Sequence, residues 1–528
     1  MKKYIKNMVI VLAILVMAAS CKVGPNYQAP KDETPQTFRY TSNATDSIIN
    51  LNWWDLFHDP VLDTLILTAL RQNKDLLIAA SRIEQARANV KFNKADYGPK
   101  IGVQANAGAT NQFLGIPGGN TFESYGASGT FNWELDFWGK FRRSTEAAKA
   151  EMLASFYGKR AIEIALISEV ATNYFQLLDY KARLAISEST LALRDSSLYI
   201  IQARFDKGYT HIIDVNQAQI QKGITQASVP RFKRYIAFTE NNLNLLMGKN
   251  MAPIITLKNL NDYQLPDSIP TGIPSEILQR RPDILQSEQF YKAQNARIGV
   301  AQAMRFPSIS LTGMLGLGSA DLSDLVSNGL GWSAGASLMG PLFEWGKNAR
   351  RVDIERELAK QYLLDYERTV LTALLEVNNS LVELSTFKEE LIANKMKMMA
   401  AQNASKLSRQ RYYQGVTSYL EVIENQRQEF DARLAYTENY QSLLNSYISL
   451  YKSLGGGWVS EAELAKYAAQ VAEDQHVNVN SIAVDSLYYN GQVVDYYLTP
   501  QQEAQRKEER KALRIKEKEQ RKLARQNK

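Results

Sequence analysis

The chain has 528 residues, with 62 Lys and Arg against 55 Asp and Glu, so its formal net charge is +7. The excess lies at the two ends: the first six residues hold three lysines and residues 503–528 hold 11 basic and 5 acidic side chains, which leaves the rest near −2. This near-neutral body argues against nucleic-acid binding, which needs a basic surface. One cysteine and three scattered histidines argue against a disulfide scaffold or a metal site, and we expect neither a metal nor a cofactor.

The first 20 residues have the pattern of a bacterial export signal. Three lysines precede an apolar stretch, residues 8–17, and Ala18-Ala19-Ser20 follow as a small-residue cleavage site. Cys21 comes next, as in lipoprotein signals, so we predict that Cys21 is acylated and begins a lipidated segment, residues 21–59. An ordinary secretory signal followed by an incidental cysteine is the alternative. Lys22 is not the aspartate that marks inner-membrane retention, which favours the outer membrane.

The chain repeats itself once, at an offset of 207 or 208 residues. The recurring landmarks are Arg204–Thr210 with Arg411–Thr417, Trp138-Gly139-Lys140 with Trp345-Gly346-Lys347, Met247-Gly248 with Leu454-Gly455, Asp75 with Asp283, and Pro99 with Pro307. We predict a first repeat over residues 60–252 and a second over 275–457, joined by a Pro-rich linker, 253–274. Each repeat should contain a helix, two strands and a long helical hairpin.

Each repeat contains two stretches in which apolar residues alternate with polar or small ones. They begin near Ile101, Thr130, Ile309 and Trp332, and aromatic residues lie at their ends. Alternation over about ten residues with aromatic ends is typical of outer-membrane barrel strands, although a soluble sandwich is the alternative for each strand alone.

Very long helical stretches follow the strands. Lys140–Lys207 holds no proline and one interior glycine, and Lys347–Gln414 holds neither. At about 1.5 Å per residue, each predicted helix is roughly 100 Å long. A glycine and a threonine then predict a tight turn, and return helices should run to Gly248 and Gly455.

The last part of the chain lies outside the repeats. We assign residues 458–500 to a C-terminal periplasmic segment of unknown role and residues 501–528 to a charged basic helical tail. The tail has the spacing of a solvated helix, and contact with peptidoglycan or anionic lipid is the alternative.

Four strands per chain cannot close a barrel, and an open sheet edge in lipid leaves backbone groups without hydrogen bonds. Two chains would give eight strands and a filled interior, whereas three give twelve strands and a lumen. The small and polar faces of the strands favour a lumen, so we predict a homotrimer.

Three motifs resemble the signature of TolC/OprM-like outer-membrane factors of the NodT-type efflux lipoprotein family. These are the segments from Cys21 to Pro30, from Trp133 to Lys140, and from Leu278 to Gly313, the last with Arg280-Arg281-Pro282-Asp283. The resemblance implies an α+β membrane protein: a trimeric twelve-stranded barrel continued by a long α-helical periplasmic tunnel. It also implies no catalysis, and outer-membrane lipid, a periplasmic adaptor (membrane fusion) protein and an inner-membrane RND transporter as partners. The function that the resemblance implies is the outer-membrane exit duct of a tripartite efflux system, which passively conducts small molecules such as drugs. The alternatives are a duct for metal ions or for type I protein secretion, or a non-transporting structural, adhesin-like coiled coil.

The resemblance also assigns roles at the hairpin tips. The tips, Gly208-Tyr209-Thr210 and Gly415-Val416-Thr417, are expected to contact the adaptor. Tyr412 and Asp214 match the family's gate tyrosine and aspartate, and Thr417 replaces its gate arginine. Glu421 and Glu424 match an aspartate pair at the tunnel entrance, where we expect an acidic ring; a solvated pair at a helix N-terminus is the alternative.

Two other motifs suggest other functions. Gly331-Trp332-Ser333-Ala334-Gly335 has the spacing of a hydrolase nucleophile elbow, but Ser333 lies within a predicted strand and only His476 follows it. Met396, Met398 and Met399 could favour soft-metal export, although methionine on a long helix usually packs. We therefore predict a passive channel that is not an enzyme.

Overall fold

The computed structural model describes residues 23–30, 56–113, 116–263, 278–327, 330–456, 486–489 and 492–495. The export signal, Cys21, residues 264–274 of the linker and the basic tail lie outside these residues. The chain divides into two units, one up to Trp458 and one from Val459 onward. In the second unit the structure describes an antiparallel pair, β5 (Ser486–Tyr489) and β6 (Gln492–Asp495).

The first unit contains both repeats. The first has α2 (Pro60–Gln72), α3 (Lys74–Ala95), β1 (Lys100–Phe113), β2 (Ile116–Leu135), α4 (Lys140–Asp206) and α5 (Ile212–Leu246). The second has α7 (Pro282–Ala303), β3 (Ser308–Ser319), β4 (Gly331–Met339), α8 (Lys347–Tyr413) and α9 (Tyr419–Ser453). Short 3₁₀ turns, η2 (Leu260–Asp262) and η3 (Leu322–Asp324), lie in connections.

The offset found in the sequence recurs in the bounds of the long helices. Both α4 and α8 have 67 residues and both α5 and α9 have 35, and the members of each pair begin and end 207 positions apart. Both 67-residue helices end one residue before the expected position. No helix in the described part of the chain combines the length and apolar character needed to cross a membrane.

The four strands of the first unit form one antiparallel sheet in the order β1-β2-β3-β4. The two repeats meet where β2 pairs with β3, from Tyr125 opposite Ser319 to Leu135 opposite Ile309. The predicted strands are therefore present, but β2 begins much earlier than its alternation indicated. Apolar side chains such as Val103, 88% exposed, and Trp332, 77% exposed, lie uncovered on this sheet. Within the described sheet, the outer edges of β1 and β4 have no partner strand.

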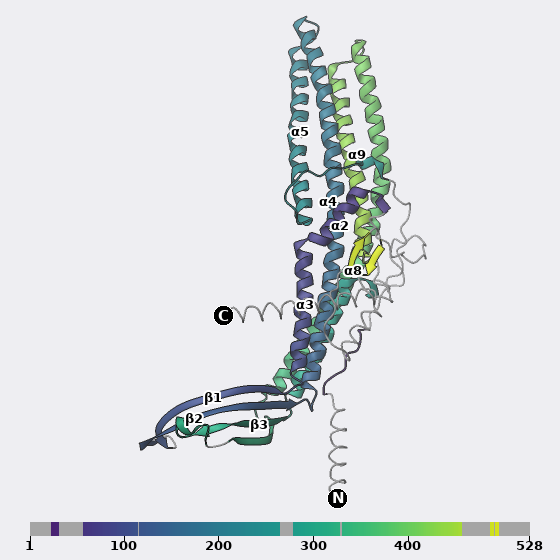
Figure 1. Ribbon diagram of the computed structural model, residues 1–528. Helices are drawn as coiled ribbons and strands as arrows, with labels where there is room; N and C mark the ends of the chain where they lie inside the picture. Colours follow the sequence, from purple (N-terminus) through teal and green to yellow (C-terminus); the bar gives the residue numbers. More distant parts are fainter. Residues whose placement is uncertain are drawn as a thin grey trace. The chain divides into compact units, whose positions relative to one another are not determined.

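The four long helices run side by side as two hairpins, α4 with α5 and α8 with α9 (Figure 1). Their shared core includes Tyr174, Phe175, Leu444 and Tyr447, all at most 1% exposed. Asp59 lies at the centre of the polar part of this core. Its carboxylate accepts hydrogen bonds from the backbone N–H of Val61 and from the hydroxyl groups of Tyr174 and Tyr263. Because each polar group in this cluster has a partner, the core can bury it without a large penalty.

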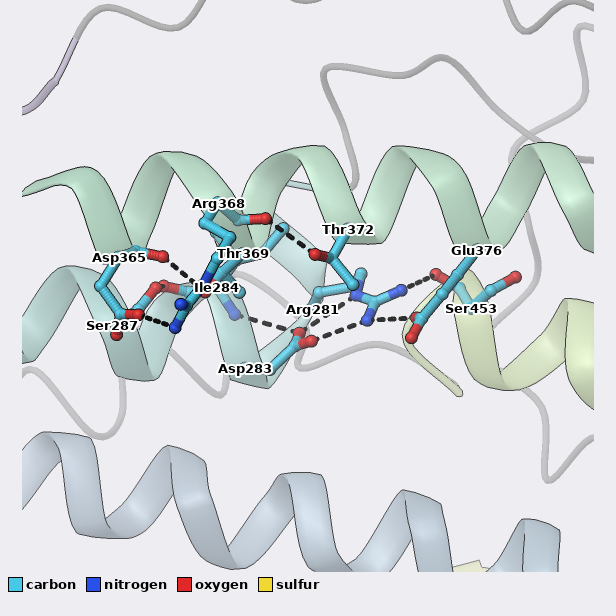
Figure 2. A network of polar contacts seen from close by, with 10 residues as sticks. All are labelled: Arg281, Asp283, Ile284, Ser287, Asp365, Arg368, Thr369, Thr372, Glu376 and Ser453. Atoms are coloured by element: carbon cyan, nitrogen blue, oxygen red, sulfur yellow. Dashed lines mark hydrogen bonds and ion pairs between the residues drawn. The ribbon is translucent and has the colours of Figure 1, made fainter.

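The network around Arg281 joins three helices of the second repeat (Figure 2). Arg281, 6% exposed, donates to Asp283 of α7 at 2.7 Å, to the carbonyl oxygen of Ser453 at 2.9 Å, and pairs with Glu376 of α8 at 2.7 Å. Burial acts to lower the pKa of Arg281, but the hydrogen bonds and charges of Asp283 and Glu376 outweigh it and raise the pKa. This contact fixes the end of α9 against the start of α7.

The first repeat has the same junction with different chemistry. Asn73, which precedes α3, donates its amide to the carbonyl oxygen of Leu246, the last residue of α5, at 2.9 Å. Gly248 then packs so closely that a Cβ would lie 2.5 Å from the carbonyl oxygen of Gln72. In both repeats, therefore, the end of the return helix is attached to the short helix that leads to the strands.

Candidate functional site: the hairpin tips

Both hairpins end in the same turn. Gly208 and Gly415 have positive φ angles of 75° and 74°, in the left-handed region that favours glycine. The next residue donates its N–H to a carbonyl near the end of the preceding helix, Tyr209 to Arg204 at 2.9 Å and Val416 to Arg411 at 3.0 Å. A Cβ at either glycine would meet nothing within 4 Å, so these positions need glycine for its backbone conformation and not for space.

Each turn is fastened by a threonine and an acid at equivalent positions. The hydroxyl of Thr210 donates to Asp214, and that of Thr417 donates to Glu421. Both acids lie in the first turn of the return helix, where a negative charge is favoured by the helix dipole. Thr417 therefore binds the neighbouring acid of its own hairpin.

The arginines of the two tips are used differently. Arg411 pairs with Glu421 at 3.0 Å within the second hairpin. Its counterpart Arg204 lies over the ring of Tyr412, with its central carbon 4.8 Å from the ring centroid. The first tip therefore reaches across to the second through a cation–π contact.

A small apolar cluster joins the two hairpins just below the tips. It consists of Ile201, Val215, Ala218, Tyr419, Val422 and Ile423, and Tyr412 packs against it. The rings of Tyr412 and Tyr419 lie 5.4 Å apart, and burial, with the charges of Tyr412 and Asp214, raises the pKa of Tyr419 to about 12. Within the described chain, Tyr412 makes no hydrogen bond to Asp214, whose carboxylate is taken by Thr210. The gate assigned to this pair stays a prediction.

The two acids of the expected ring each have a cationic partner. Glu424 accepts from Arg427 at 2.6 Å and from Gln428 at 2.9 Å, and these hydrogen bonds lower its pKa to about 2. The side chains of Glu421 and Glu424 are 35% and 47% exposed. The acids are thus accessible, but an arginine accompanies each, which sequence spacing did not indicate.

Exposed apolar residues surround both turns. Tyr209 is 78% exposed and Val416, at the equivalent position, 63% exposed; Ile212, Ile213 and Leu420 are also more than half exposed. Exposed apolar groups concentrated at the end of a hairpin are typical of a surface that a partner covers.

The segment after Cys21 docks where the strands meet the helices. The N–H of Val23 donates to the carbonyl of Trp138, and buried Arg143 donates to the carbonyls of Val23 and Gly24 at 3.1 and 2.9 Å. Gly24 has a φ of 102°, and a Cβ there would lie 2.4 Å from Cα of Gly299. Sequence reasoning noted this glycine only by resemblance and missed the role of Arg143.

The geometry gives little support to the hydrolase motif or to a metal site. Ser333 lies inside β4, paired with Met314 of β3, and not at a strand-to-helix turn; His476 lies outside the described residues. Among the described residues there is no group of three or more His, Cys, Asp or Glu that could hold a metal. Met396 and Met399 are exposed on α8.

The comparisons with known proteins all indicate the same family. A family model described as outer membrane efflux protein matches residues 65–249 and 273–456. The chain is 33% identical over 480 residues to the antibiotic efflux pump outer membrane protein ArpC of Pseudomonas putida, covering 88% of this chain and 99% of ArpC. It is 32% identical over 453 residues to the cation efflux system protein CusC of Escherichia coli O6:H1, covering 84% and 97%. The solved outer-membrane channel OprN has 29% identity and a TM-score of 0.76, covering 83% of this chain and 100% of OprN.

Proposed function

Because the chain belongs to the outer membrane efflux protein family, it is the outer-membrane component of an efflux system, and we propose that three copies form its exit duct. The observation that supports a trimer is that a sheet whose outer edges are unpaired is attached to two 67-residue helices. Pairing β4 of one copy with β1 of the next satisfies those edges, and three copies close a twelve-stranded barrel wide enough for a lumen.

Two apolar stripes on the helices support packing between copies. On α5 and α8 exposed apolar residues form runs with steps of three, four or seven, as in a coiled-coil seam. The runs are Ile213, Ile220 and Ile224 on α5, and Leu364, Leu371 and Leu375, then, 17 residues further on, Ile392, Met396 and Met399 on α8, all 52–67% exposed. Neighbouring hairpins would cover these stripes and continue the barrel as a helical tunnel. This assigns the exposed methionines to packing between copies.

Native mass spectrometry of the detergent-purified protein tests the assembly, and conductance in planar bilayers tests the duct. We expect a mass of three chains and a defined single-channel conductance. A monomer or dimer would contradict the trimer, and a trimer without conductance would contradict the open duct.

We assign the hairpin tips to the adaptor protein and, through it, to an inner-membrane RND transporter. The two tips share one turn and one exposed apolar position, Tyr209 and Val416, so a trimer would present six similar docking points. Thr210→Cys or Thr417→Cys should cross-link to the adaptor, whereas Thr386→Cys, an exposed threonine on α8 away from the tips, should not. Equal cross-linking at all three positions would contradict the placement.

We propose that Tyr412 and Asp214 close the resting duct at the tips, with Thr417 and Glu421 in place of the missing arginine contact. Because Tyr412 and Asp214 are not hydrogen-bonded within the described chain, this gate requires that the bond form in the closed trimer. A hydrogen bond to a charged group contributes about 1.5–3 kcal/mol, so three such bonds give roughly 5–9 kcal/mol if additive. About 5.5 kcal/mol is enough to swing a two-state gate from mostly closed to mostly open. Tyr412→Phe with Asp214→Ala should therefore raise single-channel conductance, and unchanged conductance would contradict this gate.

We also propose that Cys21 carries the lipid anchor in the outer membrane. Val23 is held beside Trp138, at the end of the strands, and two residues span at most about 7 Å. A lipid on Cys21 would thus be held near the level where the sheet ends. The cargo stays open: ArpC is named for antibiotics and CusC for cations, and the tip residues do not discriminate between them.

A further inference from the structure

The two repeats pair their own strands in the same register. Lys100 of β1 lies opposite Asn132 of β2. The counterparts of these residues, 208 positions on from β1 and 207 positions on from β2, are Ser308 of β3 and Met339 of β4, and they also lie opposite each other. The offsets found in the sequence therefore relate the strands of the two repeats residue by residue.

The contact between β2 and β3 joins the two repeats inside the chain. In this contact Gly129 of β2 lies opposite Leu315 of β3. Next to the strands, the indole Nε1 of Trp138 donates to the carbonyl oxygen of Pro307 at 2.7 Å, and its ring stacks on Phe306 with the centroids 4.6 Å apart. The end of the first pair of strands is thereby fixed to the start of the second pair.

Both sides of this junction recur in the chain without meeting each other. Trp345 is the counterpart of Trp138, and Pro99 is the counterpart of Pro307. Trp138 and Pro307 are partly buried, whereas Trp345 is 90% exposed and Pro99 is also exposed. Trp345 follows β4 and Pro99 precedes β1, at opposite edges of the sheet. A single chain therefore cannot bring them together as it does Trp138 and Pro307, but a second copy can.

The alternation of side chains agrees with this template. When the β2–β3 register is moved by the repeat offsets, Ala336 of β4 lies opposite Ala107 of β1 in the next copy. This register keeps the apolar positions of both strands on one face, whereas a shift by one residue would place those of β4 opposite polar or small residues of β1. The apolar positions are Ala334, Ala336 and Leu338 of β4 and Ala105, Ala107 and Ala109 of β1.

Gly108 gives an independent indication of a neighbouring strand. Its counterpart Gly316 lies so close to β2 that a Cβ would come within 2.4 Å of the carbonyl oxygen of Ala127 and of the Cβ of Ser128. A Cβ at Gly108 would meet only the Oγ of Ser124, at an ordinary 3.8 Å, so no atom of the described chain requires glycine there. The repeated glycine is explained if another strand approaches β1 as closely as β2 approaches β3.

We propose that the second repeat of each copy docks on the first repeat of the next copy in the geometry of the junction inside the chain. Ala336 then lies opposite Ala107 of the next copy, and the indole of Trp345 donates to the carbonyl oxygen of Pro99 of the next copy. The inference rests on the trimer proposed above and adds to it the strand register and the aromatic contact. A tryptophan that faces lipid at the membrane interface is the other role that fits Trp345, but that role leaves the recurrence of Pro99 unexplained.

Cysteine pairs in the full-length chain test the register. Ala107→Cys with Ala336→Cys should form disulfides between copies and give a covalent trimer on denaturing gels, because directly opposite residues have Cα atoms about 4.5–5.5 Å apart. Ala105→Cys or Ala109→Cys, each with Ala336→Cys, keeps the same face but places the cysteines diagonally, about 7–8 Å apart and beyond the reach of a disulfide. These two shifted pairs should leave the chains as monomers on the gel.

Gly129→Cys with Leu315→Cys, the equivalent pair inside one chain, is the control for folding and oxidation, and it should form a disulfide within each chain. If native mass spectrometry shows a trimer but a shifted pair cross-links as well as Ala107→Cys with Ala336→Cys, the register is wrong although the assembly stands. The same holds for a trimer in which none of the pairs between copies cross-links. A protein that is monomeric in native mass spectrometry would instead refute the assembly itself.

A photoreactive side chain tests the aromatic contact. Trp345→benzoylphenylalanine should give, on irradiation, an adduct of two chains that mass spectrometry maps to the peptide containing Pro99. Trp332→benzoylphenylalanine is the matched control, because Trp332 is 77% exposed but lies at the opposite end of β4, and it should not label that peptide. Adducts of position 345 with lipid alone, no adduct with the Pro99 peptide, or equal labelling from both positions would overturn the contact.

Discussion

Replacing Arg281 with methionine tests the junction that fixes the end of α9 to the start of α7. The substitution keeps the apolar stem but removes the donors to Ser453, Asp283 and Glu376. The carbonyl of Ser453, a residue 3% exposed, then lies buried without its partner, which costs about 1–3 kcal/mol. Loss of a cation at the C-terminus of α9 adds about 0.3–1 kcal/mol.

The acidic partners add little to this cost. The side chains of Asp283 and Glu376 are 38% and 44% exposed, so water can solvate them, and exposed ion pairs contribute at most about 1 kcal/mol. The expected local destabilisation by Arg281→Met is therefore about 2–4 kcal/mol. Glu376→Gln, which removes only the exposed charge, should cost less than about 1 kcal/mol.

Hydrogen exchange followed by mass spectrometry can measure this locally. A loss of about 2–4 kcal/mol corresponds to exchange roughly 30- to 1,000-fold faster, in peptides from the last turn of α9 and the first turn of α7. Peptides from the hairpin tips should be unchanged. If Glu376→Gln accelerates exchange at the junction as much as Arg281→Met, the exposed pair and not the buried carbonyl carries the stability, and the reasoning is wrong.

Three further predictions follow from the turns, the anchor and the tips. Gly248→Ala should destabilise the fold more than Gly208→Ala, because both force a left-handed alanine at about 1 kcal/mol but only the first pushes a Cβ against a backbone carbonyl; equal melting temperatures would contradict this. Cys21→Ser should abolish labelling by a tagged fatty acid, and labelling equal to that of the unsubstituted protein would refute the lipid anchor. Glu421→Ala with Glu424→Ala removes two negative charges and leaves Arg411 without its partner and Arg427 paired only with Asp431, so cation preference, measured as reversal potential in a KCl gradient, should fall; an unchanged preference would mean that these acids do not line the entrance. Because the pKa of Glu424 is about 2, below its unfolded value, its stabilising contact should be complete above the unfolded pKa and lost only as the pH falls through about 2.

The sequence indicates local features of the fold well. The near absence of proline and glycine, with one glycine in Lys140–Lys207 and neither residue in Lys347–Gln414, places the two 67-residue helices to within one residue. The turn glycines recur in the two repeats because only a left-handed backbone closes that turn. Alternation locates the middle of each strand but not the early start of β2 at Ile116, because the residues there are turn formers that pairing with β1 holds extended. Pairing with β1, rather than propensity, decides that extension, since β3 pairs with β2 only from Tyr125 onward.

Contacts between segments that are far apart in the sequence could not be predicted from the sequence. The close approach of Gly24 to Gly299 and the buried bonds of Arg143 join residues more than 100 positions apart, and no spacing rule reveals them. The arginine partners of Glu421 and Glu424 lie within reach on the sequence, but helix geometry alone does not decide which neighbours pair.

The unpaired edges of β1 and β4 have a genetic consequence. In the proposed trimer each chain must offer one edge to each neighbour, so a single copy with a blocked edge leaves the whole ring open. If intact and edge-defective chains are made in equal amounts and mix at random, only about one assembly in eight contains three intact copies. A proline introduced on the outer edge of β4 should therefore be dominant over an intact gene in the same cell, whereas a substitution that prevents the chain from folding at all should be recessive.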